Sequence, residues 1–312
     1  MSQTAIELHL AMDAASNSKA LWCWPKSATR FSFRASSALT LLLAGCVGGG
    51  SPNPAPIDLQ QQYADAVADA RTALPSEIWR HLTPINDQNP ALVWENGVVG
   101  SRLLVVTWLG DAGKYYQCSV VGGCSGNVAC IEGGECPTYK YDSWVTVVPD
   151  IKNFFANSPP EPLRIAQLLG LPPAAATPGD ASEYKYMLEL WVAPKDLFRP
   201  CPDTEISDTV CELDFPLDAF HTADLGNLVR ATAGPDYGVF MSYPNWFANQ
   251  TSYSYTPGAN PYPWTRLGYT YDWGSNTHIG LSEFVLHGSK VDGSTISVGI
   301  KSVKTTSAYF AQ

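Results

Sequence analysis

The residues best suited to nucleophilic or acid–base chemistry lie near the C-terminus, in the segment HIGLSEFVLH. It contains His278, Ser282, Glu283 and His287. In an extended strand His278 and Ser282 would share one face and the other two residues the opposite face, so a serine nucleophile could lie beside a histidine base. Ordinary strand residues would give the same pattern, and the segment matches neither H-E-x-x-H nor G-x-S-x-G. These four residues are candidate catalytic residues, and whether the chain is an enzyme is left open.

A second group of chemically capable side chains surrounds His221. Its carboxylates are Asp203, Glu205, Asp208, Glu212, Asp214, Asp218 and Asp224. Carboxylate oxygens could bind a cation such as calcium, but their spacing is not that of an EF-hand. The glycine-rich stretch GGCSGNVACIEGG also lacks the spacing of a phosphate-binding loop. A solvated acidic loop is the simpler interpretation, and we predict neither a metal nor a cofactor.

Six cysteines form a third set, and their spacing favours disulfides over a metal site. They are Cys118, Cys124, Cys130, Cys136, Cys201 and Cys211. The first four recur every six residues, whereas the paired ligands of structural zinc sites are usually two to four residues apart. An even number of cysteines is typical of an exported, disulfide-bonded protein. The pairing among the first four stays open, while Cys201 and Cys211 most simply close one loop.

The N-terminal segment indicates where the chain goes. Lys26, Arg30 and Arg34 precede the short apolar run ALTLLLAGC, the arrangement of a secretory signal. Its ending, LAGC, resembles the lipobox of bacterial lipoproteins, and no family is recognised for the rest of the chain. The resemblance implies cleavage before Cys46 and lipid on that cysteine, which would hold the protein at the membrane. We therefore expect a signal peptide over residues 1–45 and a flexible Gly/Pro/Ser tether over residues 46–58.

Charge narrows the range of partners. The chain has 19 basic and 29 acidic residues, a net charge of −10. An acidic protein is poorly suited to nucleic acid or to anionic lipid surfaces. We therefore predict no nucleic-acid partner. The lipobox resemblance implies a place in the bacterial cell envelope, at the outer membrane or facing the periplasm.

Hydrophobic patterning predicts an α+β fold over residues 59–312, with an internal boundary near residues 230–237 left open. Apolar residues at helical spacing predict an N-terminal helix over residues 57–74. The middle should mix strands and helices, including a strand within residues 97–110, a strand and short helix over residues 141–155 and a helix over residues 161–173. The last third should be antiparallel β-sheet, with a hairpin turn at Asp292 and Gly293. Disulfides should fasten the loops.

Aromatic residues are concentrated in residues 237–273, where 12 of the chain's 36 lie. Because Pro, Gly and Asn interrupt them, we expect loops and strands there, with some rings exposed for recognition of a glycan or an envelope protein. The predicted contacts are Trp246, Trp264, Arg266, Asp272 and Trp273. A binding lipoprotein is the first hypothesis, a structural envelope component the second, and an exported hydrolase using Ser/His or carboxylates the third.

Overall fold

The computed structural model describes residues 58–110, 130–138, 142–156, 159–216, 228–231, 236–258 and 260–311. These residues belong to one compact unit, Ala55–Gln312. The predicted leader, Cys46, most of the tether, Cys118, Cys124 and His221 lie outside the described residues. Within them the predicted α+β fold is confirmed, with helices around a large antiparallel sheet.

The main sheet has the strand order β2-β11-β4-β1-β3-β10-β5 in the described part of the chain, and all its pairings are antiparallel. Its strands are β1 (Leu103–Leu109), β2 (Glu135–Pro137), β3 (Ser143–Val147), β4 (Tyr186–Val192), β5 (Leu197–Phe198), β10 (Phe284–Leu286) and β11 (Ser297–Thr305). Two small antiparallel sheets accompany it. They pair β6 (Leu228–Arg230) with β7 (Phe240–Ser242), and β8 (Tyr269–Tyr271) with β9 (Ile279–Ser282).

Both faces of the main sheet are buried, as β1 illustrates. Leu103 and Val105 point into one core together with the disulfide-bonded Cys130 and Cys136. The next residues in alternation, such as Val106, point into a second core. That core packs against α2 (Asp150–Phe154), α3 (Pro162–Leu168) and α6 (Thr306–Phe310). Because β1 is covered on both sides, its sequence reads as a continuous apolar run rather than an alternating one.

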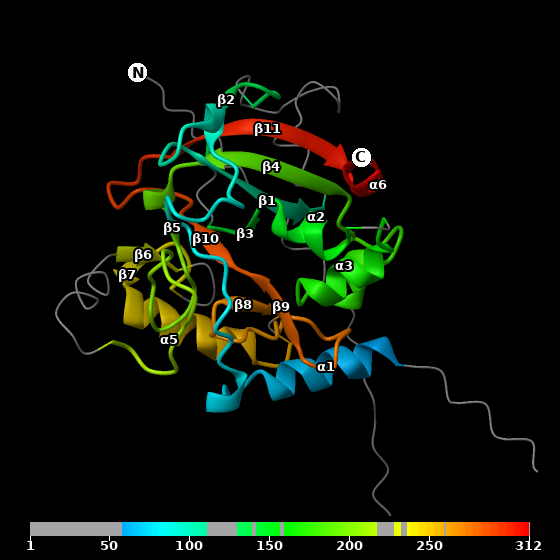
Figure 1. Cartoon of the computed structure of the whole chain (residues 1–312). Helices are drawn as coiled ribbons and strands as arrows, with labels where there is room; N and C mark the ends of the chain where they lie inside the picture. Colours follow the sequence, from blue (N-terminus) through cyan, green and yellow to red (C-terminus); the bar gives the residue numbers. More distant parts are fainter. Residues whose placement is uncertain are drawn as a thin grey trace, which may run out of the picture. The chain divides into compact units, whose positions relative to one another are not determined.

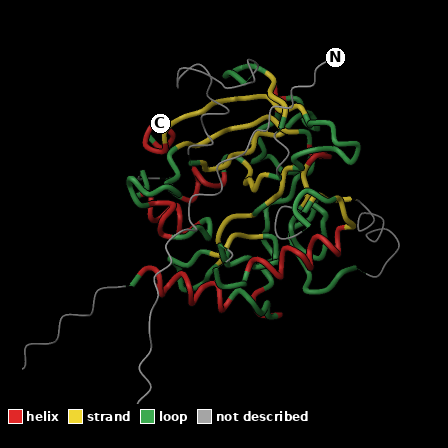
Figure 2. The backbone as a smooth tube through the Cα atoms, turned by 180° about the vertical axis from the view of Figure 1, so that it is seen from behind, coloured by secondary structure: helices red, strands yellow, loops and turns green. Residues whose placement is uncertain are grey.

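A third, aromatic-rich core lies among α1 (Leu59–Asp69), α5 (Tyr243–Ser254) and the β8–β9 sheet. Figures 1 and 2 show the two long helices from opposite sides, next to these short strands. The side chain of Asp58 begins α1 by accepting hydrogen bonds from the backbone of Gln60 and Gln61, at 3.0 and 3.1 Å. The buried face of the helix then meets the rings: Tyr63 and Trp273 are 6.0 Å apart between centroids.

Helix α5 corrects the prediction of loop and strand over residues 243–254. Pro244 occupies its first turn, where the missing N–H has no partner to lose. Tyr243, Trp246 and Phe247 then fall at helical spacing and pack into the aromatic core. Interspersed Asn, Ser and Thr are weak helix formers, and they concealed this spacing. Tertiary packing of the three rings stabilises the helix.

The disulfide prediction is confirmed for the cysteines that the structure describes, which pair as Cys130–Cys136 and Cys201–Cys211. The predicted turn near Asp292 is also present, since Gly293 N donates to Lys290 O at 2.8 Å. It does not form the expected hairpin, however. β10 pairs with β3 and β5, whereas β11 pairs with β2 and β4, so the turn joins strands from different parts of the sheet.

Candidate functional site

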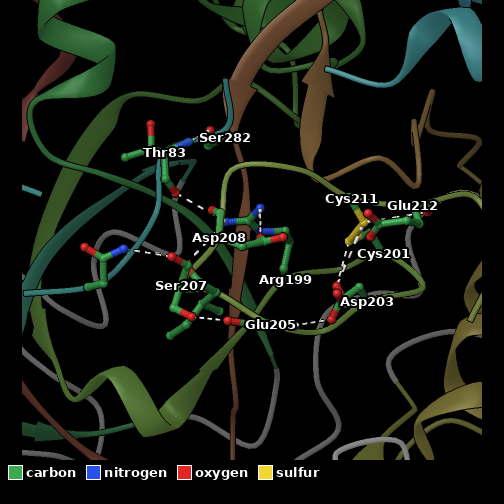
Figure 3. Close-up of polar contacts among 12 residues, drawn as sticks. Thr83, Arg199, Cys201, Asp203, Glu205, Ser207, Asp208, Cys211, Glu212 and Ser282 are labelled. Carbon is green, nitrogen blue, oxygen red and sulfur yellow. Dashed lines mark hydrogen bonds and ion pairs between the residues drawn. A yellow bond between two sulfur atoms is a disulfide. The ribbon is translucent and has the colours of Figure 1, made fainter. Parts of the chain in front are cut away.

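The structure does not bring the predicted Ser282–His278 pair together. His278 has a φ of 57°, so the chain there is left-handed rather than extended and the expected shared face does not exist. Its ring stacks on Tyr271, with centroids 4.7 Å apart. The Ser282 hydroxyl instead accepts a hydrogen bond from the backbone N–H of Thr83 at 2.7 Å (Figure 3). His287 is also separate, with its ring tilted against that of Phe198 and the centroids 4.8 Å apart, and burial lowers its pKa to about 4.

The predicted recognition surface is wrong, because its tryptophans are buried. Trp246, Trp264 and Trp273 are 1%, 0% and 6% exposed. They are part of the aromatic core, where apolar rings leave water for packing contacts. These rings therefore cannot act as surface contacts in this fold.

Asp272 and Arg266, the two polar side chains predicted to contact a ligand, instead hydrogen-bond to other parts of the protein. Asp272 is buried, and the guanidinium of Arg164 donates to both its oxygens at 2.8 and 2.6 Å. Arg266 donates to the carbonyl of Arg71 at 2.8 Å, fixing the end of the α1 segment. Both side chains already hold structural hydrogen bonds.

The acidic loop surrounds a buried arginine, which sequence reasoning missed. Arg199 is fully buried, and its Nη1 donates to Asp208 at 3.1 Å while Nη2 donates to backbone carbonyls (Figure 3). Burial raises the pKa of Asp208 to about 6, opposed by the charge of Arg199. The Cys201–Cys211 disulfide closes this loop. Its carboxylates thus offset a buried positive charge, and no group of three or more metal-binding side chains forms in the described chain.

The strongest candidate site is a cavity of about 350 Å³ on the helix-covered side of the main sheet. This volume is at the lower end of ordinary small-molecule sites, roughly 300–1,000 Å³. Four aromatic rings and two carboxylic side chains face it. They are Trp108, Trp144, Tyr184, Tyr262, Asp142 and Glu283.

Strand register explains how the polar side chains reach one cavity. Trp144 and Thr146 share a face of β3, and Asp142 directly precedes that strand. β10 pairs with β3 so that Phe284 opposes Val145, which places Glu283 beside Thr146. Glu283 stands where the chain leaves β9 and enters β10, with its N–H donating to Gly268 O at 3.0 Å. Strand pairing in the main sheet therefore positions Trp144, Thr146 and Glu283 at the cavity.

Four of the eight buried polar side-chain atoms that lack a hydrogen-bond partner in the described chain belong to residues that line this cavity. Among the described residues, both carboxylate oxygens of Glu283, Oδ2 of Asp142 and Oγ1 of Thr146 are buried without a hydrogen-bond partner. Glu283 is only 2% exposed. Buried polar atoms are nearly always paired, so the grouping of four unpaired atoms around one cavity makes it the strongest candidate site.

Burial also changes the protonation of the two acids. It raises the pKa of Glu283 to about 8. The neighbouring Trp264 opposes this rise, but its Nε1–H donates to the Pro200 carbonyl at 3.1 Å and leaves the carboxyl unpaired. Burial raises the pKa of Asp142 to about 7, against the hydrogen bond from Gly288 and the charge of Arg230. At neutral pH Glu283 is thus mostly protonated, and the cavity contains groups able to exchange protons.

Among the residues that line this cavity, sequence reasoning had selected only Glu283, as a candidate catalytic residue. A signal for the rest was present in YDSWVTVV, where Asp142, Trp144 and Thr146 alternate along a strand whose other positions are mainly apolar. A polar and aromatic face on a strand inside a covered sheet points to a cavity rather than to solvent. That interpretation requires knowing that helices cover this face.

Comparison with protein-family models, curated proteins and solved structures found no match for this chain. Two disulfides in the described residues indicate a non-reducing compartment. None of the described helices has the length and apolar character required to cross a bilayer. Inferences about function therefore depend on the cavity and its chemistry.

Proposed function

We propose that the protein is an exported, lipid-anchored binding protein of the bacterial cell envelope that holds a small organic ligand in the Glu283 cavity. The observation that carries the proposal is the set of unpaired buried polar atoms on Asp142, Thr146 and Glu283, facing a cavity walled by aromatic rings. Trp144 and Tyr262 lie 5.8 Å apart between ring centroids and are half-buried, so their rings can pack against a ligand. A volume of about 350 Å³ suits a small molecule better than a long glycan or a folded partner.

Replacing Thr146 with Val tests this function with little change in shape. Removing an unpaired buried hydroxyl should leave the fold intact or stabilise it by roughly 1 kcal/mol. It should also weaken, by about tenfold, any ligand that hydrogen-bonds there. We would screen a library of small polar molecules against the processed, detergent-solubilised protein by thermal shift, then measure hits by calorimetry.

The matched control is Thr177→Val. The hydroxyl of Thr177 donates to the Pro173 carbonyl at 3.0 Å, and this residue does not line the cavity. It should leave ligand affinity unchanged. Hits that bind the Thr146→Val protein as tightly as the wild type would place binding elsewhere. A complete absence of hits would favour the structural envelope component instead.

The anchoring part of the proposal rests on LAGC and on the basic and apolar residues before it. We expect Cys46→Ala to abolish fatty-acid labelling in a bacterial host and to move the protein out of the detergent phase. Cys23→Ala, within the predicted leader, is the control and should be labelled normally. Labelling that persists in the Cys46→Ala protein would refute lipidation at this residue.

An exported hydrolase remains a second candidate because of one specific observation. Glu283, with a pKa of about 8, could donate a proton at neutral pH, while Asp142 in the same cavity could accept one. Turnover of a screened ester or glycoside that disappears in Glu283→Gln and persists in Thr177→Val would select this alternative.

A further inference from the structure

The described walls of the cavity carry three unpaired carboxyl oxygens and no basic side chain. Glu283 contributes two unpaired oxygens and Asp142 one. Among the described lining residues there is no Lys, Arg or His. The charge of Arg230 lowers the pKa of Asp142, whereas no basic side chain contributes to the pKa of Glu283. The deepest carboxyl group therefore has no positive partner within the described protein.

Several donors that line the cavity are already used, although the hydroxyl of Thr146 is unpaired. The hydroxyls of Tyr262 and Thr270 donate to backbone carbonyls at the end of α3, at 3.3 and 2.6 Å. Trp108 Nε1 donates to the Thr306 hydroxyl at 2.8 Å. A neutral sugar, whose hydroxyls both donate and accept, would leave many of its acceptors unpaired here. An ammonium group has donors and no acceptor, which matches the cavity.

The aromatic walls favour the same ligand. Trp144 and Tyr262 both line the cavity, and Trp108 and Tyr184 form an edge-to-face pair with centroids 5.4 Å apart. Faces of Trp and Tyr rings attract organic cations, most strongly where water is excluded. Their apolar surface would also cover the alkyl part of an amine.

We propose that the ligand is an organic cation, an aliphatic amine whose ammonium group pairs with the carboxylate of Glu283 between these aromatic rings. The inference rests on the proposed function, because it names the class of molecule that the cavity binds. Pairing requires ionised Glu283, so binding near pH 7 releases the carboxyl proton to solvent while the amine stays charged. Among the described residues, the other titratable groups that line the cavity are Asp142, Tyr184 and Tyr262.

Hexylamine and 1-hexanol test the proposal because they differ mainly in charge. Calorimetry at pH 7, on the protein from which only the leader has been removed, should show the amine binding at least about tenfold more tightly than the alcohol. An added ion pair of about 1.4 kcal/mol would supply this factor. Repeating the titration in two buffers of different ionisation enthalpy should reveal proton release with the amine and none with the alcohol. Glu283→Gln should remove both the preference and the proton release, while the alcohol binds as before.

Glu189→Gln is the matched control. Glu189 is a buried carboxylate that accepts from the Ser302 hydroxyl at 2.8 Å and does not line the cavity. It should retain the amine preference. If the alcohol binds the wild type as tightly as the amine, or if Glu283→Gln keeps the preference, the cationic ligand is refuted while the binding function stands. If hexylamine, 1-hexanol and the library of small polar molecules all fail to bind, both the binding function and the cationic ligand are refuted.

Discussion

Glu283→Gln should raise the free energy of unfolding at pH 8 and remove much of its dependence on pH. Burial holds the pKa of Glu283 at about 8 in the folded protein, against a usual value of 4.5. Between these values the folded state retains a proton that the unfolded chain has lost, so stability falls as pH rises. Over pH 5 to 8 the loss from this one group is about 3 kcal/mol. Glutamine resembles the neutral acid and has no such loss.

Chemical denaturation of both proteins at several pH values in this range measures the effect. The wild type should become steadily less stable. The variant should follow a shallower curve, because Glu283 no longer contributes while Asp142 and Asp208, whose pKa values burial also raises, still contribute with the same sign. Glu189→Gln should keep the slope of the wild type, since Glu283 is unchanged. Parallel curves for wild type and Glu283→Gln would show that Glu283 is not buried as a neutral acid.

Trp264→Ala should cost about 3–5 kcal/mol of stability, the range expected for a large aromatic residue removed from a core. The side chain is fully buried, 4.9 Å from the ring of Phe247 and about equally far, 6.0 and 6.1 Å, from those of Trp246 and Trp144. Its loss would also leave the Pro200 carbonyl without the indole donor. Thermal and urea unfolding should both register the change.

The control for this substitution is Trp79→Ala. Trp79 is 37% exposed and pairs with His81 on the surface, so its loss should cost much less, about 1 kcal/mol or under. If the two variants are equally mild, Trp264 is not the core residue described here, and the exposed recognition surface becomes tenable again.

Local sequence signals predicted those elements that local rules control. Helical spacing indicated the helix that follows Asp58, a β-branched apolar run indicated the buried strand before Gly110, and the position of Pro162 indicated the helix that it begins. Disulfides followed from cysteine number and spacing. The prediction failed where packing between distant segments decides the outcome, as in α5, whose aromatic spacing was hidden among weak helix formers.

The site was less predictable because its residues are far apart in the chain. Asp142 and Thr146 come from one strand, Tyr184 from the approach to another, and Glu283 from a junction 137 positions beyond Thr146. Aromatic density marked residues 237–273 as unusual, but it could not separate rings that fill a core from rings that line a cavity. Only Tyr262 of that segment's rings lines the cavity among the described residues.

The junction at Glu283 limits how this part of the chain can change. β9, which precedes Glu283, pairs with β8, and β10, which follows it, pairs with β3 and β5. Glu283 alone separates the two strands, so the pairing register of each is tied to that of the other. A one-residue insertion or deletion on either side would turn every side chain of that strand to the opposite face. Residues 279–286 can therefore accept substitutions but not a change of length, and any natural variant that lengthens or shortens this stretch should have lost the cavity.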